Sequence, residues 1–431
     1  MKTKVICLCF VYYILICSAA TNKFPITTNQ GNRAMIVWSN YSPRTEISPT
    51  FSIDIRSGKE KNPALRIDSK SPEQFGFWQC RIDNIIPEQH YQFSAWYKTK
   101  SVQNDRRSVI ARLEWLDKNG RSLRPPEYCL DVQKSGQWKK VEYIAQAPQK
   151  TVSLDIQLSL GFTKGTVWWD DISLVQVTNL TERTCRVATV FLRPNNTKSS
   201  AQSVEEFCRL VETNNPGNLD FVCLPEGITV IGTGKSYYEV SEPIPGPTTE
   251  RLGRLASKIH AYIIAGLYER HNHIVYNTAV LIDRNGKIVG TYRKTHLPRE
   301  EWEKGITPGN EYPIFQTDIG KIGIIICWDL QFPEPARSMA AKGAEIIFIP
   351  IWGGSETLAK ARAIENSVFI VTSTYDMRSF ILDPTGGICT EATSSSPFIS
   401  TDISLDKIYY QPWIGNMKTR VWKEWRPDIR W

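Results

Sequence analysis

Short runs of alternating apolar and polar residues dominate the chain from residue 21 to about residue 184. A period of two sends successive side chains to opposite faces of a strand, so each run predicts a half-buried β-strand. The clearest runs are residues 75–82, 91–97, 108–115, 138–145 and 152–160. Turn-forming residues such as Asn119 and Gly120 separate them. Many short strands joined by turns predict an all-β sandwich or jelly roll.

The pattern changes at Cys185, where fully apolar runs begin to alternate with helical ones. Val204, Phe207 and Val211, for example, recur at helical spacing and give one apolar face. Strands are expected at 186–192, 221–224, 262–267, 277–282, 288–293, 344–350 and 368–372, and helices at 203–213, 248–259, 333–342 and 356–367. Alternating strands and helices predict an α/β domain. Residues 407–431 form an aromatic, basic tail without a clear period.

The first twenty residues have the composition of a secretory signal peptide. A basic start precedes an apolar run over residues 5–17, and Ser18 to Ala20 are small residues suited to cleavage. A membrane anchor is one alternative, but the run is shorter than a normal span. A lipoprotein acylated at Cys17 is another, although Ile16 stands where a small residue is usual. We expect cleavage after Ala20 and a secreted or periplasmic protein.

Length and charge limit the number of domains and the classes of partner that we expect. The 431 residues suggest two or three domains, which we place as a signal peptide over 1–20, a β-sandwich over 21–180, and an α/β domain with its tail over 183–431. The net charge is +8, and the basic residues are spread without a long Lys/Arg block. No recognition motif accompanies this charge, so we expect no nucleic-acid partner.

Cysteine and histidine usage gives no sign of a metal site. Three of the ten cysteines lie in the signal peptide, and the odd number that remains leaves at least one thiol unpaired. Cys80 and Cys129 lie in the same region, so they are either a disulfide or two buried thiols. No Cys-x-x-Cys pair exists and the histidines lack metal spacing, so we expect no zinc.

Three reactive side chains each follow an apolar strand of the second region. Glu226 ends Phe-Val-Cys-Leu-Pro-Glu, Lys294 ends Thr-Tyr-Arg-Lys, and Cys327 ends Ile-Gly-Ile-Ile-Ile-Cys. Rigid strands place such residues at an opening lined by loops, which suits a nucleophile and the residues that assist it. Each residue alone would be unremarkable: an inert buried cysteine, a capping carboxylate and a solvated cation. Their common placement favours a shared site.

The local signatures around these residues resemble the nitrilase (carbon–nitrogen hydrolase) superfamily. They are Leu-Pro-Glu226, Tyr-Arg-Lys294-Thr-His-Leu-Pro, Cys327-Trp-Asp followed by Phe-Pro-Glu334, and Arg362-Ala-Ile-Glu-Asn366. The resemblance runs from about Cys185 to the C-terminus. It implies a four-layer α-β-β-α sandwich, no metal or organic cofactor, and a homo-oligomer in which the tail reaches across to a partner subunit. The alternative is a tail packed on its own domain.

The resemblance also implies roles. Cys327 is the expected nucleophile and Glu226 the base that accepts its proton. Lys294 and the backbone N–H of Trp328 are expected to stabilise the oxyanion. His296 is expected to support its loop. Arg362 and Glu365 are expected to pair across one helix turn, with a structural role shared by Asn366.

A second glutamate is implied in the loop after the lysine, where three candidates compete. We choose Glu301, because the family places this residue several positions after the lysine and before the Pro-Gly. Glu300 and Glu303 stay open as alternatives. A carboxylate beside Lys294 would fix the ammonium through a charge-assisted hydrogen bond.

The predicted function is hydrolysis of a non-peptide C–N bond in a linear amide or N-carbamoyl amine. Trp328-Asp329-Leu330 resembles the amidase and carbamoylase branches, whereas true nitrilases usually have Trp-Glu-Asn there. Gln331 departs from an arginine common in those branches, which weakens a substrate assignment by analogy. Nitrile hydrolysis or acyl transfer on the same fold is one alternative, and an inactive carbohydrate-binding protein is another.

The strand Gly165-Thr-Val-Trp-Trp-Asp-Asp-Ile resembles the closing strand of jelly-roll carbohydrate-binding modules. The resemblance implies a glycan ligand for the N-terminal domain, stacked on aromatic residues. The candidate aromatic residues are Trp78, Trp96, Trp115, Trp138, Trp168 and Trp169. Alternation favours a core position for most of them.

Overall fold

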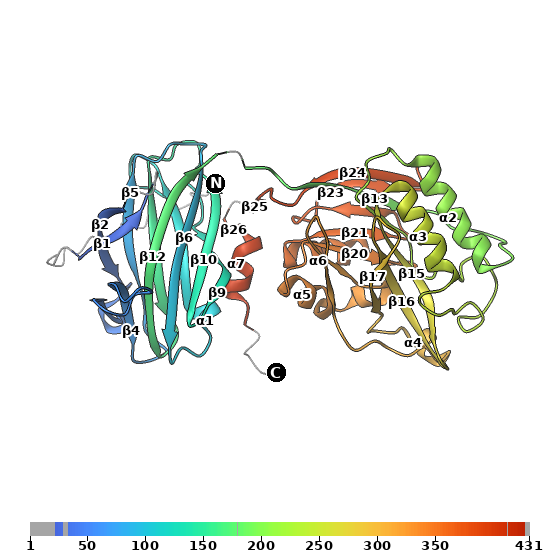
Figure 1. Ribbon diagram of the computed structural model, residues 1–431, viewed down its shortest axis with the longest axis horizontal. Helices are drawn as coiled ribbons and strands as arrows, with labels where there is room; N and C mark the ends of the chain where they lie inside the picture. The colour runs from blue at the N-terminus through green and yellow to red at the C-terminus, as the bar shows by residue number, and fades with distance from the viewer. Residues whose placement is uncertain (1–21, 29–32, 179, 412, 427–431) are drawn as a thin grey trace, which may run out of the picture. The chain divides into compact units, whose positions relative to one another are not determined.

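A computed structural model describes residues 22–28, 33–178, 180–411 and 413–426. The predicted signal peptide, residues 1–20, lies outside the described residues. The chain divides into two compact units (Figure 1). The first comprises the described residues up to Leu180 together with those after Gln411, and the second is Thr181–Gln411. Within the described residues, no helix has the length and apolar character needed to cross a membrane.

The first unit is built almost entirely of β-strands. One ladder runs β8-β7-β11-β5-β2-β1-β12-β6-β10-β9, with β4 on β12 and β3 on β4. The elements are β1 (Asn22–Thr27), β2 (Arg33–Tyr41), η2 (Thr45–Ile47), β3 (Thr50–Asp54), β4 (Ala64–Ser69), β5 (Phe75–Asp83), β6 (His90–Lys100), α1 (Asp105–Ser108), β7 (Val109–Leu116), β8 (Glu127–Tyr128), β9 (Leu130–Ser135), β10 (Trp138–Gln146), β11 (Ser153–Gly161), β12 (Gly165–Val177), β26 (Gly415–Asn416) and α7 (Met417–Glu424).

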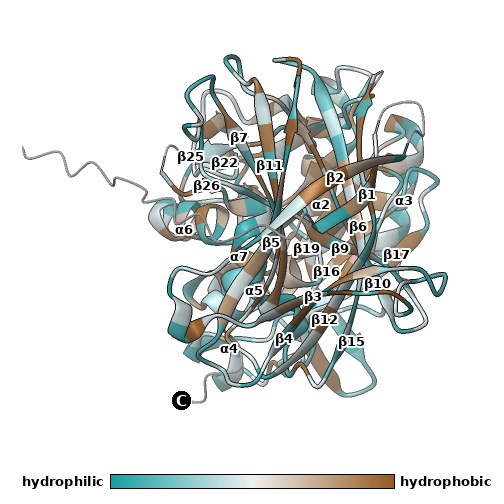
Figure 2. Ribbon diagram, turned by 90° about the vertical axis from the view of Figure 1, so that its left-hand side faces the viewer, coloured by the Kyte–Doolittle hydropathy of each residue, from teal (hydrophilic) through white to brown (hydrophobic). Residues whose placement is uncertain are grey.

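Alternation along these strands gives the unit a single core, as the brown and teal bands of Figure 2 illustrate. Trp78, Trp115 and Trp169 lie in this core with at most 1% exposure. These three cannot stack on a glycan, which corrects part of the predicted aromatic platform. The disulfide alternative is also wrong, because Cys80 and Cys129 are both buried free thiols. Residues whose aromatic or thiol character suggested function instead fill space between strands.

The C-terminal segment packs on the first unit, which differs from the predicted assignment of residues up to 431 to the α/β domain. Helix α7 inserts Lys423, whose side chain is 1% exposed and lies 3.5 Å from Asp131 of β9. The Asn416 amide donates to the Tyr143 hydroxyl over 2.9 Å. These contacts on a polar strand surface have no periodic signal in the sequence, so pattern reasoning could not place the segment.

The second unit contains two six-stranded sheets with the orders β17-β16-β15-β14-β13-β24 and β18-β19-β20-β21-β22-β23. Three neighbouring strands in each sheet run parallel, β13-β14-β15 and β19-β20-β21, and the outer strands pair antiparallel. The strands are β13 (Thr184–Val190), β14 (Phe221–Cys223), β15 (Tyr262–His271), β16 (Ile274–Ile282), β17 (Ile288–Arg293), β18 (Ile314–Gln316), β19 (Lys321–Ile324), β20 (Ile346–Pro350), β21 (Phe369–Ser373), β22 (Ser379–Leu382), β23 (Ile388–Ala392), β24 (Phe398–Ser404) and β25 (Tyr410–Gln411).

The two sheets pack face to face through apolar side chains such as Phe221 and Phe348, whose ring centroids lie 5.2 Å apart. Helices α2 (Ser200–Asn214) and α3 (Pro247–Ile259) cover the first sheet, and α5 (Pro333–Ala341) and α6 (Glu356–Asn366) cover the second (Figure 1). The arrangement is the mixed α/β fold expected from the alternating pattern. The remaining helical elements are α4 (Arg299–Glu303) and the 3-10 helix η3 (Cys327–Gln331).

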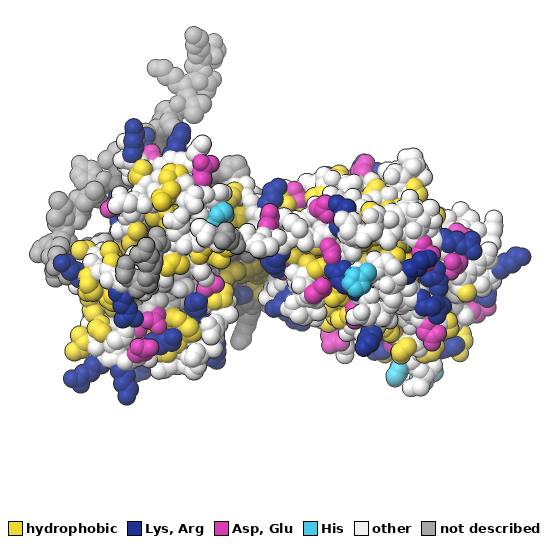
Figure 3. All heavy atoms as spheres, turned by 45° about the horizontal axis from the view of Figure 1, so that its top comes forward, with side chains coloured by type: hydrophobic (Ala, Val, Ile, Leu, Met, Phe, Trp, Pro, Cys, Tyr) yellow, Lys and Arg dark blue, Asp and Glu magenta, His cyan; other side chains and the backbone are white. Residues whose placement is uncertain are grey.

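Charged side chains of both signs are mixed over the surface in Figure 3. Many of the basic ones are paired, as Arg183 is with Glu345 and Asp406 at 2.9 and 2.6 Å. On the displayed face, basic and acidic side chains lie near one another, as the even spread of Lys and Arg along the sequence suggests.

Candidate active site

The first sheet delivers two charged side chains at the ends of its strands. Glu226 follows the end of β14, and Lys294 comes directly after β17. The chain around Glu226 needs glycine, because Gly227 has φ +60°. Gly266 of β15 is needed for a different reason: a Cβ there would lie 2.7 Å from the Glu226 Cα. Close backbone approach thus brings the carboxylate against the neighbouring strand.

The second sheet delivers the cysteine. Strand β19 ends at Ile324, two residues earlier than the apolar run suggested, and Cys327 is the first residue of η3. Cys327 has φ +41°, a left-handed conformation that is costly for a residue with a Cβ. The surrounding structure must hold this turn. The Cys327 thiol donates to the Gly353 carbonyl over 3.8 Å, and the residue is still partly exposed.

An ammonium and two carboxylates lie in direct contact beneath this turn. Lys294, Glu226 and Glu301 are 1%, 2% and 4% exposed. The Lys294 Nζ donates to Glu226 Oε1 over 2.8 Å and forms an ion pair with Glu301 Oε2 at 2.9 Å. Buried charges persist only when they are paired in this way. The structure therefore brings together three of the predicted residues in one cluster.

Among the three competing glutamates, only Glu301 contacts the lysine within the described residues. Its helix α4 points the other two outward, where Glu300 pairs with Lys304 and Glu303 with Arg299. The choice of Glu301 is therefore the one consistent with the geometry. Trp328 has an exposed side chain (41%), which leaves the predicted role to its backbone N–H.

Two residues that the sequence analysis missed complete the carboxylate cluster. The Asn277 side-chain amide, fully buried on β16, donates to Glu226 Oε1 over 2.7 Å and to Glu301 Oε1 over 2.6 Å. The Tyr268 hydroxyl on β15 donates to Glu301 Oε1 over 3.2 Å. Both residues lie inside apolar strands, so their only sequence signal is a polar residue at a position where a core side chain is expected.

Burial and charge shift the proton affinities of this cluster. Burial together with the Glu226 charge raises the pKa of the Cys327 thiol to about 12, and Lys294 opposes the rise. Burial lowers the pKa of Lys294, but the charges of Glu226, Cys327 and Glu301 outweigh it and the net shift is upward. Burial raises the pKa of Glu301 against the effect of Lys294. The resting state at neutral pH is a thiol beside a charged ammonium.

Asp329 connects the cysteine turn to the lysine strand and was also missed as a site residue. It is fully buried and accepts hydrogen bonds from the backbone N–H of Ile326 at 3.0 Å and the Tyr292 hydroxyl at 2.7 Å. Its other oxygen accepts from the backbone N–H of His296 at 2.9 Å and the Thr295 hydroxyl at 3.0 Å. The Trp-Asp after the cysteine and the Thr-His after the lysine are therefore two sides of one contact.

The helix residues Arg362 and Glu365 pair across one turn at 3.0 Å, as their spacing suggested. Arg362 also donates to the Leu330 carbonyl over 2.9 Å, so it holds the far end of η3. His296 lies 3.0 Å from Asp329 through Nδ1 and stacks on Phe332. Among the residues that the structure describes, no group of three or more His, Cys, Asp or Glu side chains is arranged to hold a metal ion.

Comparison with known proteins adds a family match. The family model described as Carbon-nitrogen hydrolase matches residues 185–411. A probable nitrilase of Schizosaccharomyces pombe is 33% identical over 224 residues, which are 47% of this chain and 82% of that protein. An omega-amidase of Xenopus tropicalis is 28% identical over 235 residues, or 48% of this chain and 84% of that protein. An N-carbamoylputrescine amidase of Arabidopsis thaliana is 32% identical over 222 residues, with shares of 42% and 72%.

Solved structures of a nitrilase-superfamily protein and of an amidase also match part of this chain. A nitrilase-superfamily protein of Saccharomyces cerevisiae matches with a TM-score of 0.45 and 22% identity, over 53% of this chain and 93% of that one. An amidase from Nesterenkonia sp. matches with a TM-score of 0.47 and 20% identity, over 53% and 94%. All of these matches cover about half of the present chain.

Proposed function

Because this chain belongs to the carbon-nitrogen hydrolase family, we propose that it hydrolyses a linear amide or N-carbamoyl amine. In this proposal Cys327 is the nucleophile, Glu226 is the general base and Lys294 is the cation that stabilises the oxyanion. The observation that carries this assignment is the buried Lys294 ammonium, 2.8 Å from Glu226 and 2.9 Å from Glu301. A nucleophile, a base and a cation in one water-poor site are the parts that acyl transfer requires.

The acylation step begins with a protonated thiol, since its pKa is raised to about 12. Glu226, whose charge acts on this thiol, accepts the proton as the sulfur attacks the carbonyl carbon. The carbonyl electron pair moves to oxygen, where Lys294 and the backbone N–H of Trp328 stabilise it. The C–N bond then breaks, the amine or ammonia leaves with the proton from Glu226, and a thioester remains.

The hydrolysis step uses the same base. Glu226 takes a proton from water as the water oxygen attacks the thioester carbonyl, and Lys294 again faces the developing oxyanion. The C–S bond breaks, Glu226 returns its proton to the sulfur, and the acid leaves. Glu226 is ionised again at the end of each step, and the thiol proton that leaves with the amine is replaced by one from water, so no further acid or base is needed.

Glu301 and Asn277 act as positioning residues in this scheme. Glu301 contacts the Lys294 ammonium, and the Asn277 amide connects Glu301 to Glu226. The two residues therefore hold the ammonium and the Glu226 carboxylate at a fixed separation. Fixed donors and acceptors need no reorganisation when charge moves, which is the main source of electrostatic catalysis. The names of the omega-amidase and N-carbamoylputrescine amidase relatives support an amide or carbamoyl substrate.

The test is ammonia release by the purified protein from linear amides, N-carbamoyl amines and nitriles. We expect turnover of an amide or carbamoyl compound, and a loss of at least about 10³-fold in Cys327→Ser. Cys389→Ser is the matched control, because Cys389 is exposed and lies outside the cluster. Equal activity in both variants would refute the nucleophile assignment, and turnover of nitriles alone would replace the substrate class.

We also propose that the protein is exported after cleavage at Ala20. The basic start, the short apolar run and the small residues of the sequence support this proposal. Edman sequencing of the protein secreted by its expression host should give Thr-Asn-Lys-Phe as the first residues. Retention of Met1 on the active protein would contradict it.

A further inference from the structure

The segment that follows β21 joins the two sheets of the second unit. Strand β21 belongs to the second sheet and ends at Ser373, yet the next residue, Thr374, forms a parallel bridge with Phe191, directly after β13 of the first sheet. The Ser373 hydroxyl also donates to the Val190 carbonyl of β13 over 3.0 Å. These bonds hold the segment against the first sheet, so Tyr375 within it has a defined position between the two sheets.

Tyr375 reaches the proposed base from this segment. Its side chain is 3% exposed and belongs to the same apolar cluster as Leu224 and Ile228, which flank Glu226 in the sequence. The Tyr375 hydroxyl donates to the backbone carbonyl of Glu226 over 2.7 Å. A side chain from the second sheet therefore holds the backbone of the base on the first sheet.

The backbone of Tyr375 holds the loop next to the proposed nucleophile. Its N–H donates to the Trp352 carbonyl over 3.1 Å, and the two aromatic rings meet edge-on with centroids 5.1 Å apart. The residue after Trp352 is Gly353, whose carbonyl accepts from the Cys327 thiol over 3.8 Å. One residue thus contacts both the base and the loop that receives the thiol.

Asp376 contacts the same loop but has a weaker claim to a role in the reaction. A Cβ at Gly353 would lie 3.3 Å from the Asp376 side chain, which forms an ion pair with Arg193 of the first sheet. The two side chains of this pair are 45% and 46% exposed. Exposed pairs contribute about 0–1 kcal/mol, whereas losing a buried hydrogen bond is costlier. The buried contact of Tyr375 is therefore the stronger link between the sheets.

We propose that Tyr375 is a positioning residue for the reaction proposed above, on which this inference rests. Its hydroxyl fixes Glu226 and its N–H fixes the Gly353 loop, so the carboxylate and the sulfur are held at a separation suited to proton transfer. The hydroxyl uses the backbone carbonyl of Glu226. The carboxylate therefore keeps its contact with Lys294 and its capacity to accept the thiol proton.

A structural role for Tyr375 makes a different prediction from a positioning role. A buried tyrosine hydroxyl needs an acceptor in any protein, so the hydrogen bond by itself fits both roles. A residue that acts through Glu226 loses its effect once Glu226 cannot accept a proton. A residue that only stabilises the fold acts independently of Glu226, and the two losses then multiply.

The test is Tyr375→Phe, which removes only the hydroxyl, alone and combined with Glu226→Gln in the full chain. Alone, it should lower kcat for ammonia release about 10- to 100-fold, because misplaced reacting groups are slow, while KM changes less than about threefold. In the Glu226→Gln background it should change kcat less than about twofold. An unchanged kcat in Tyr375→Phe, or losses that multiply in the double variant, would overturn the proposal.

Alkylation of Cys327 by iodoacetamide gives a second measurement that needs no substrate. The Glu226 charge raises the pKa of the thiol and the Lys294 charge lowers it. Displacement of Glu226 in Tyr375→Phe should therefore move the pH midpoint of alkylation downward, measured in a Cys389→Ser background. An unchanged midpoint contradicts the proposal even if kcat falls. If no amide or carbamoyl compound is turned over, the proposed function fails, and the midpoint still decides the role of Tyr375.

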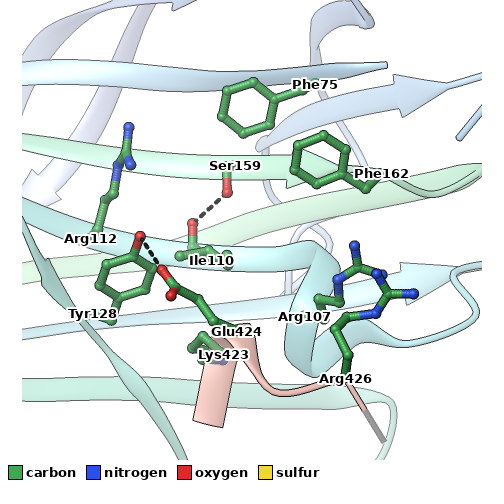
Figure 4. A pocket seen from close by; sticks show the side chains of 10 residues that line it. All are labelled: Phe75, Arg107, Ile110, Arg112, Tyr128, Ser159, Phe162, Lys423, Glu424 and Arg426. Carbon is green, nitrogen blue, oxygen red and sulfur yellow. Dashed lines mark hydrogen bonds between the residues drawn. The ribbon is translucent and has the colours of Figure 1, made fainter. Parts of the chain in front are cut away.

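Two control variants remove hydroxyl groups elsewhere. Thr189→Val removes a fully buried hydroxyl of the same unit, which donates to the Thr372 carbonyl over 2.6 Å. Tyr128→Phe makes the same chemical change in the first unit, where Tyr128 lines a cavity of about 350 Å³ and its hydroxyl donates to Glu424 over 3.4 Å (Figure 4). Both should keep kcat and the alkylation midpoint, and urea unfolding reports any loss of the fold. Equal losses of kcat in Thr189→Val and Tyr375→Phe would overturn the proposal.

Discussion

The Lys294 ammonium faces two buried carboxylates, and this imbalance of charge shapes the chemistry of the site. With the thiol protonated, the cluster holds one cation and two acidic groups, and burial raises the pKa of Glu301. In the proposed mechanism, moving the thiol proton to Glu226 removes negative charge from the carboxylates just as negative charge appears on the substrate oxygen. The cation therefore gains a new partner when it loses an old one, which favours the transition state over the resting state.

Asn277→Leu tests the amide that bridges the carboxylates. Its Nδ2 donates to both Glu226 and Glu301, and a hydrogen bond to a charged group contributes about 1.5–3 kcal/mol. Without this donor the ionised carboxylates are less stable, so the acidic limb of kcat/KM should move about 1–2 pH units upward. A pH profile that falls uniformly without moving would show that Asn277 only maintains the fold.

Glu226→Gln separates proton acceptance from thiol activation. The Glu226 charge is one cause of the raised thiol pKa, and Lys294 acts in the opposite direction. Removing the carboxylate charge should therefore lower the pH midpoint of Cys327 alkylation, while hydrolysis falls by at least about 10²-fold.

The alkylation is measured with iodoacetamide and peptide mass mapping in a Cys389→Ser background, so that the exposed thiol does not compete. Glu226→Asp serves as the control that keeps the charge. An upward move of the midpoint in Glu226→Gln would mean that Glu226 favours the thiolate, contrary to the proposal.

At the scale of elements, Asp329 joins η3 to the segment after β17. Its two oxygens accept from donors on both segments, so an amide in their place must turn an N–H toward at least one donor. Asp329→Asn should lower the free energy of unfolding of the second unit by about 2–4 kcal/mol. It should also reduce kcat, because the turn at Cys327 loses its anchor. Urea unfolding and ammonia release measure the two effects.

The control for this variant is Asp402→Asn, which breaks an exposed pair with Arg186. Exposed ion pairs contribute about 0–1 kcal/mol, so the unfolding midpoint should barely change. Equal losses in Asp329→Asn and Asp402→Asn would contradict the idea that the buried carboxylate anchors the turn.

Sequence patterns predicted the α/β and all-β regions because alternation and helical spacing report burial directly. They also pointed to Glu226, Lys294 and Cys327 as strand-end residues. Asn277, Tyr268 and Asp329 escaped because their partners lie on other strands, and pairing across a sheet leaves no local mark. The predicted aromatic platform likewise included Trp78, Trp115 and Trp169, which fill the core.

At the scale of the whole molecule, each unit has its own hydrophobic core. Separate cores predict separate unfolding transitions in calorimetry, since each unit buries its apolar surface internally. The C-terminal segment continues the chain of the second unit (the hydrolase unit) but packs with the first unit (the β-unit). A change in α7 should therefore act on one transition only.

Lys423→Ala tests this division. The Lys423 side chain is 1% exposed and lies 3.5 Å from Asp131, which also accepts from the Tyr97 hydroxyl. Its loss should cost about 1–3 kcal/mol and lower the Tm of the β-unit by roughly 3–10 °C. The Tm of the hydrolase unit and the thermal inactivation of amide hydrolysis should stay unchanged. Lys134→Ala, on the exposed strand β9, is the control with the same charge change. If both transitions fall together in Lys423→Ala, the units unfold as one cooperative body and the C-terminal helix stabilises both.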